Sequence, residues 1–91
     1  MSLAWQIKFS DTAKKQLAKL DPSESSRIAS FLTNRVAASS NPRLLGKALS
    51  GSKLGDYWRY RVGNYRVICE ILDDKLVILA VSIGHRREVY R

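Results

Sequence analysis

Three arginines flank a tight turn in the second half of the chain, at Arg59, Arg61 and Arg66. Between the last two lies Gly63-Asn64, a dipeptide that favours a two-residue β-hairpin loop. A loop of that length places Arg61 directly opposite Arg66. Because side chains alternate between the faces of a strand, Arg59 joins them on the same face. The sequence therefore predicts three guanidinium groups close together on one face of a hairpin.

Such a cluster is chemically suited to an anion. Like charges opposite each other in a sheet cost about 0.2–1 kcal/mol, so a protein that needs only solubility would disperse them. Phosphate is the natural ligand, because the planar guanidinium bonds two of its oxygens at once. The alternative is a solvated face whose charge is partly offset by Glu70.

Proton transfer needs a different kind of side chain, because arginine stays protonated at working pH. His85 is the chain's one histidine. Its unperturbed pKa of about 6.5 makes it the side chain best prepared for acid–base work near neutrality. The alternative is a residue of the C-terminal tail that only bonds to backbone.

The charge balance points to a polyanionic partner. The 91 residues contain 16 Lys and Arg against 8 Asp and Glu, a net charge of +8. Nucleic acid, an anionic membrane surface and an acidic protein all fit this balance, and a charge that only keeps the chain in solution is the alternative. Hydrophobic residues make up 45% of the chain, which excludes a disordered tail.

Several other classes are excluded. The one cysteine, Cys69, permits no disulfide framework and no cysteine metal cluster, and we expect a buried, inert thiol. We expect neither a metal nor another cofactor. The chain has no run of 18 apolar residues, so we expect no membrane span. The first six residues lack the pattern of a signal peptide, which predicts a cytoplasmic protein.

The elements that position the arginines can be predicted from hydrophobic periodicity. Apolar and polar residues alternate at residues 5–9, which predicts a strand. Ser10 begins one helix and Asp21-Pro22 begins a second, which runs to about Ala38. Residues 43–56 show no clear period and are interpreted as a connector. Three further strands are expected at residues 57–62, 65–72 and 75–83. This order predicts one α+β domain over residues 1–91, with two N-terminal helices packed on a four-stranded antiparallel sheet.

The last strand is apolar on both faces, which indicates a central position. Strict alternation places four of its residues on the arginine face: Val77, Leu79, Val81 and Ile83. Because these cannot all be left in water, we expect a curled sheet, a returning tail or a partner to cover them. A returning tail would bring four more residues near the arginines: His85, Arg86, Arg87 and Tyr90.

Two runs of residues resemble a known family. They are Trp-Arg-Tyr-Arg-Val-Gly-Asn-Tyr-Arg-Val-Ile at residues 58–68 and Gly-His-Arg-Arg-Glu-Val-Tyr at residues 84–90. Together with the order of elements they resemble the RelE toxins of the RelE/ParE superfamily, over nearly the whole chain. The resemblance implies the toxin of a bacterial type II toxin–antitoxin pair. Such toxins cleave mRNA in the decoding site of the ribosome and are neutralised by a cognate antitoxin that wraps them, here an acidic, RelB-like protein.

The resemblance also implies roles for individual residues. Arg59 and Arg61 match the basic pair on the family's second strand, and Arg66 matches its phosphate-binding arginine. The best-known members carry lysine at that pair, so arginine here is a departure that removes a candidate base. The implied catalytic set is Arg59, Arg61, Arg66, His85, Arg86 and Tyr90. Other basic residues would bind RNA: Lys47, Lys53, Arg87 and Arg91.

The implied reaction is attack of a ribose 2′-hydroxyl on the adjacent phosphate. The arginines would stabilise the dianionic phosphorane, which is usually the largest contribution of such a site. Two alternatives stay open from the sequence: a ParE-like toxin that inhibits DNA gyrase, and an RNA-binding module without catalysis. Binding to a membrane surface is disfavoured, because neither helix combines a one-sided basic face with bulky aromatic residues.

Overall fold

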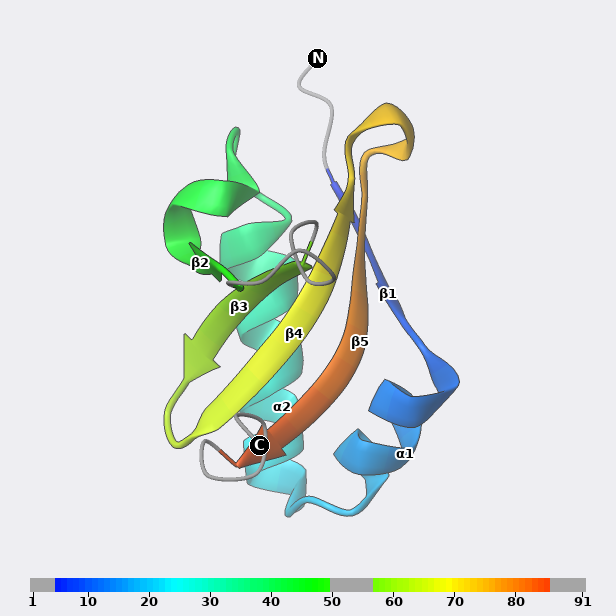
Figure 1. The fold of residues 1–91 in the computed structure, drawn as a ribbon. Helices are drawn as coiled ribbons and strands as arrows, with labels where there is room; N and C mark the ends of the chain where they lie inside the picture. Colours follow the sequence, from blue (N-terminus) through cyan, green and yellow to red (C-terminus); the bar gives the residue numbers. More distant parts are fainter. Residues whose placement is uncertain (1–4, 50–56, 86–91) are drawn as a thin grey trace.

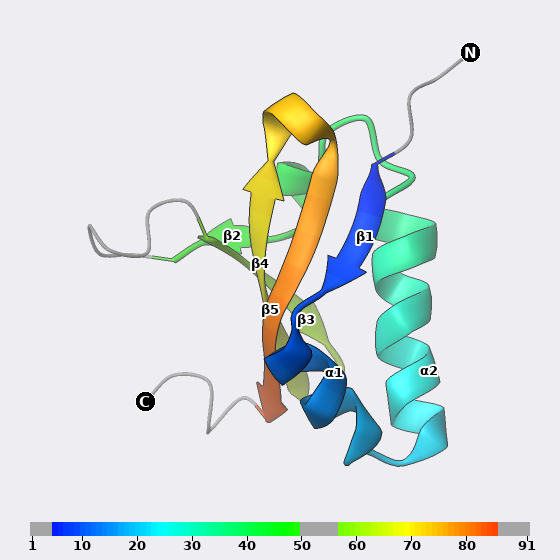
Figure 2. The same ribbon diagram turned by 90° about the vertical axis from the view of Figure 1, so that its right-hand side faces the viewer.

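Two consecutive helices cover one face of the sheet. The computed structural model describes residues 5–49 and 57–85, beginning with strand β1 (Gln6–Phe9) and helices α1 (Asp11–Ala18) and α2 (Pro22–Phe31). Both helices lie on the same side of the sheet (Figures 1 and 2). Ser10 caps α1 as predicted, since its hydroxyl accepts from the Ala13 amide at 3.1 Å.

The second helix ends close to the predicted residue, but its last turn is wide. A π-helical turn, η1 (Leu32–Val36), continues α2, and the Ala37 amide donates to the Leu32 carbonyl at 2.8 Å. None of the helices within residues 5–49 and 57–85 is long and apolar enough to cross a membrane.

The segment interpreted as a connector contains regular structure. A 3-10 turn, η2 (Pro42–Leu45), follows η1, and Gly46 connects it to a short strand, β2 (Lys47–Ala48). The backbone of β2 pairs antiparallel with β3 (Tyr57–Val62). A two-residue strand is too short to show a period in sequence, which is why periodicity missed it.

The prediction of four antiparallel strands was therefore wrong in detail. Within the described residues the sheet has five strands in the order β1-β5-β4-β3-β2, where β4 is Tyr65–Leu72 and β5 is Val77–His85. β1 runs parallel to β5, and the other neighbours are antiparallel. Parallel pairing requires a long crossover, which the chain between β1 and β5 supplies. β5 lies between two strands, as its apolar faces predicted.

The hairpin register is confirmed. Arg61 lies opposite Arg66, and Arg59 lies opposite Ile68. Gly63 has φ 60°, a left-handed conformation that this type of turn requires and that glycine adopts without strain.

The expected face of the last strand is only partly correct. The pairing of β4 with β5 shifts between Ile68 and Cys69, so Val81 bulges out of the ladder. Val77 and Leu79 lie on the arginine face as expected, but Ile83 lies opposite Val67 and is 2% exposed in the core. Ser82 and Gly84 occupy the arginine face beyond the bulge.

The bulge coincides with the end of β1. There the Ser10 amide donates to the Ala80 carbonyl and the Ser10 hydroxyl donates to the Val81 carbonyl at 3.1 Å. Further along, the Gln16 side chain accepts from the Ile83 amide. Ser10 and Gln16 thus form hydrogen bonds with backbone groups at the edge of β5 beyond the end of β1.

The core lies between the helices and the sheet. Its buried members are Ala13, Ile28, Leu32, Val36, Tyr60, Val62, Val67, Cys69, Ile78, Ala80 and Ile83. The Tyr60 hydroxyl is buried and donates to the Pro42 carbonyl at 2.8 Å. Cys69 is a buried free thiol, as predicted, and its burial raises its pKa to about 12.

Candidate functional site

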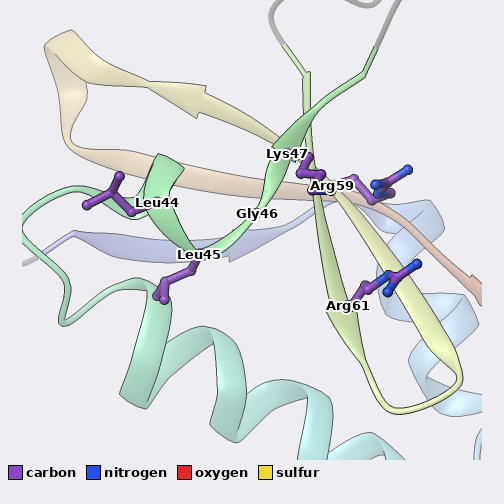
Figure 3. A pocket seen from close by; sticks show the side chains of 6 residues that line it. All are labelled: Leu44, Leu45, Gly46, Lys47, Arg59 and Arg61. Atoms are coloured by element: carbon purple, nitrogen blue, oxygen red, sulfur yellow. The ribbon is translucent and has the colours of Figure 1, made fainter.

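A cationic hollow lies where β2 joins β3, with its cations on the side of the sheet away from the helices. Its volume is about 220 Å³, and its lining is Leu44, Leu45, Gly46, Lys47, Arg59 and Arg61. Figure 3 shows the side chains of Arg59 and Arg61 extending from β3, with Lys47 beside Arg59. Lys47 is the direct partner of Arg59 in the β2–β3 ladder, so the two cations share a face.

Gly46 allows this close approach. A Cβ at residue 46 would fall well inside van der Waals contact of the Arg59 carbonyl oxygen, and 2.8 Å from a ring carbon of Tyr60. Only glycine lets the chain pass so close to β3 and continue into the pairing of Lys47. The sequence signal was present in the connector's glycines, but their partner strand could not be read from it.

Arg66 occupies the middle of the same face. It lies between Arg61 on β3 and Gly84 on β5. The sequence predicted that it shares a face with Arg59 and Arg61, and on that face it is only 4% exposed. One guanidinium nitrogen donates to the Tyr65 carbonyl at 3.1 Å, while Nε is buried without a hydrogen-bond partner.

This burial makes Arg66 the strongest candidate on the face for contact with an anion. Within the described part of the chain, no carboxylate lies within ion-pair distance of it. A buried charge without a counter-charge is unfavourable, and a buried donor without an acceptor adds to that cost. A bound anion would relieve both. The arginine site consists of Lys47, Arg59, Arg61 and Arg66.

His85 does not join the arginine site. It lies opposite Tyr65 and therefore on the helix side of the sheet, with the two ring centroids 5.9 Å apart. There it lines a hollow together with Gln16 of α1 and with Lys19 and Leu20, which follow that helix. The strand continues through Gly84 to His85, so His85 itself is not part of a tail that returns to the arginines.

Five of the proposed residues lie outside the described ranges: Lys53, Arg86, Arg87, Tyr90 and Arg91. Sequence reasoning missed one cation on the arginine face. Lys8 of β1 is exposed and lies opposite Leu79, which shares that face. Its place depends on the parallel pairing of β1 with β5, which local patterns do not encode.

Comparison with known proteins identifies the family of the chain. A family model described as the ParE toxin of type II toxin–antitoxin systems matches residues 7–90. The chain belongs to this toxin family. The relatives described next carry names of the RelE type, from the wider RelE/ParE superfamily.

Two relatives show the likeness in sequence. Toxin RelG of Mycobacterium tuberculosis is 27% identical over 89 residues, which cover 98% of this chain and 99% of that protein. A putative RelE-like toxin protein of Escherichia coli is 27% identical over 84 residues, or 92% of this chain and 85% of that protein.

Two solved structures show it in fold. A free-state variant of the E. coli toxin RelE superposes with a TM-score of 0.76 at 27% identity, covering 97% of this chain and 92% of that one. A RelBE toxin–antitoxin complex of M. tuberculosis gives a TM-score of 0.83 at 24% identity, covering 97% and 98%. The RelE fold positions the arginine site of this toxin.

Proposed function

We propose that this toxin is an mRNA endoribonuclease that acts on the ribosome, in the cytoplasm, and stops translation. The observation that carries the proposal is Arg66, a buried guanidinium with an unpartnered Nε, directly opposite Arg61. Such an arrangement favours a ligand with several anionic oxygens on one centre, as in a phosphodiester. The likeness to toxins named RelE also supports an mRNA endoribonuclease.

The proposed reaction is attack of the ribose 2′-hydroxyl oxygen on the adjacent phosphorus. The P–O5′ bond breaks, and a 2′,3′-cyclic phosphate and a 5′-hydroxyl are the products. Arg59, Arg61 and Arg66 stabilise the added negative charge of the phosphorane, the role for which permanently charged, preorganised donors are best suited. Arg86 and Tyr90, which the resemblance places in the site, complete the proposed set.

Proton transfer is the weaker part of the site. His85 faces the helices, so we leave it out of the proposed catalytic set. Glu70 shares the arginine face, since it lies opposite Tyr57 and Leu79. A site with strong charge stabilisation and little acid–base capacity favours an enzyme whose substrate is oriented by another body, here the ribosome.

The matching family model is described by its ParE toxin, so gyrase inhibition is the second candidate. The test incubates the purified toxin with mRNA on programmed ribosomes and, separately, with gyrase and relaxed plasmid. We expect cleaved mRNA and normal supercoiling, with loss of cleavage in Arg61→Ala. Intact mRNA with blocked supercoiling would establish the gyrase candidate. Intact mRNA together with retained RNA binding would favour a binding module.

We also propose an acidic, RelB-like antitoxin as the partner. Several solved relatives are RelE toxins in complex with RelB antitoxins. The net charge of +8 complements an acidic protein. An acidic open reading frame beside the toxin gene is the expected source.

A further inference from the structure

One ion pair joins two segments that are 30 residues apart. The two terminal nitrogens of Arg43 in η2 donate to the two carboxylate oxygens of Asp73 at 2.8 and 2.7 Å. Asp73 begins the turn η4 (Asp73–Lys75) between β4 and β5. Both segments lie at the same end of the sheet (Figure 2). A two-point contact of this kind fixes orientation as well as distance.

Further contacts tie η2 to β3. The Arg43 guanidinium lies 5.6 Å from the centre of the Trp58 ring, close enough for a cation–π contact. The Trp58 indole donates to the Arg43 carbonyl at 2.9 Å, so backbone and side chain of this one residue are both held. The guanidinium is thus held between the aromatic ring and the carboxylate.

The segment held in this way leads directly into the arginine site. After η2 comes Gly46, and then Lys47 in register with Arg59. The backbone path from Arg43 to Lys47 is only four residues long, so a movement of η2 moves Lys47. The Leu49 amide, which donates to the Tyr57 carbonyl at 3.1 Å, reports whether β2 remains paired.

We propose that Arg43 and Asp73 are positioning residues that hold Lys47 beside Arg59, and so shape the arginine site for a nucleic-acid phosphate. This inference rests on the proposed function, because it names the same site. In this proposal neither residue contacts the phosphate, and the carboxylate of Asp73 acts through Arg43.

The proposal predicts an effect opposite in sign to simple electrostatics. Removing an acidic charge from a cationic protein should strengthen its binding to RNA. Asp74 is the matched control, since it is the next residue, is also exposed, and forms no ion pair with Arg43 among the residues that the structure describes. Asp74→Asn should therefore bind RNA as tightly as the parent or more tightly. Asp73→Asn should bind about two- to fivefold more weakly than Asp74→Asn, the range for losing one exposed ion pair.

The experiment titrates a fluorescent single-stranded RNA oligonucleotide with each variant at several salt concentrations. Displacement of Lys47 removes one phosphate contact, so Asp73→Asn and Lys47→Ala should each reduce the slope of log K against log salt by about 0.7. The two changes together should reduce it no further. Asp73→Glu keeps a carboxylate and should restore most of the slope. Equal slopes for Asp73→Asn and Asp74→Asn would overturn the proposal.

Amide exchange separates this inference from the proposed function. In Asp73→Asn, the Leu49 amide should exchange faster than in Asp74→Asn, while the β4 and β5 amides keep their protection. Unchanged Leu49 exchange would overturn the inference whatever the RNA result. Faster exchange with unaltered RNA binding would overturn the role in the site. RNA binding with the predicted changes, but without cleavage on ribosomes, would support the inference and contradict the proposed function.

Discussion

Arg66 shows how one residue can make a surface chemically specific. A solvated arginine can contact any anion from the solvent. The buried Arg66, whose Nε has no hydrogen-bond partner, can contact only a ligand whose shape lets an anionic group reach it. Its partners in the two neighbouring strands are Arg61, which carries a like charge, and Gly84, which has no side chain. A bound anion would offset the cost of burying this charge.

Replacing Arg61 or Arg66 by Ala should therefore slow the cleavage step strongly. We expect a loss of about 2–4 kcal/mol in transition-state stabilisation from each change, the scale for one preorganised donor. Arg61→Lys should recover only part, because a point charge lacks the two-point contact. Single-turnover cleavage on saturated, programmed ribosomes measures this step. Arg35→Ala on the helix side is the control, and parental rates for both site variants would refute the assignment.

The thiol of Cys69 should be unreactive in the folded protein. Its raised pKa of about 12 leaves roughly one thiol in 10⁴ ionised at pH 8. Because the folded pKa lies above the unfolded value, this group stabilises the fold fully below the unfolded pKa. That contribution is lost as pH rises from the unfolded value towards the folded one. Reaction with an aromatic disulfide reagent at pH 8 should be slow without denaturant and fast in urea, and fast labelling of native protein would contradict the structure.

At the scale of elements, local signals were sufficient for some parts of the fold and not for others. The hairpin register follows from Gly63-Asn64, two residues inside the element they define. The parallel pairing of β1 and the short β2 depend on partners far along the chain, which no local period encodes. The bulge at Val81 has the same origin, because it forms where Ser10 bonds to β5. Lys8 was overlooked and Ile83 misplaced for these nonlocal reasons.

Ser10 should be more important than an ordinary helix cap. Its hydroxyl accepts from the Ala13 amide and donates to the Val81 carbonyl, so Ser10→Ala removes a cap and leaves the bulge carbonyl without this bond. We expect a loss of about 1–2 kcal/mol in the free energy of unfolding, towards the upper end for caps. Urea unfolding measures it. Ser26→Ala, at an exposed position on α2, should change stability by less than about 0.5 kcal/mol. Equal effects of the two changes would show that Ser10 has no special role.

At the scale of the whole molecule, the helices and the arginine site lie on opposite faces of the sheet. The helices cover one face of the sheet (Figure 2). The opposite face carries Lys8, Lys47 and the arginines. Together with a net charge of +8, this arrangement gives the molecule a long-range positive field. Such a field increases the rate of encounter with any acidic partner, and salt screens it.

The association of toxin with the proposed acidic antitoxin should therefore depend on salt mainly through its on-rate. Two double variants distinguish the effect of the long-range field from the effect of direct contact with the antitoxin. They are Lys14→Gln with Lys15→Gln on α1, and Arg59→Gln with Arg61→Gln on β3. Each lowers the net charge by two, but only the second changes the arginine site. Both should slow association by a similar factor at low salt. Only the second pair should also speed dissociation, if the antitoxin covers the arginine site. Stopped-flow mixing with the purified antitoxin gives both rates, and an on-rate that is the same at low and high salt would contradict electrostatic steering.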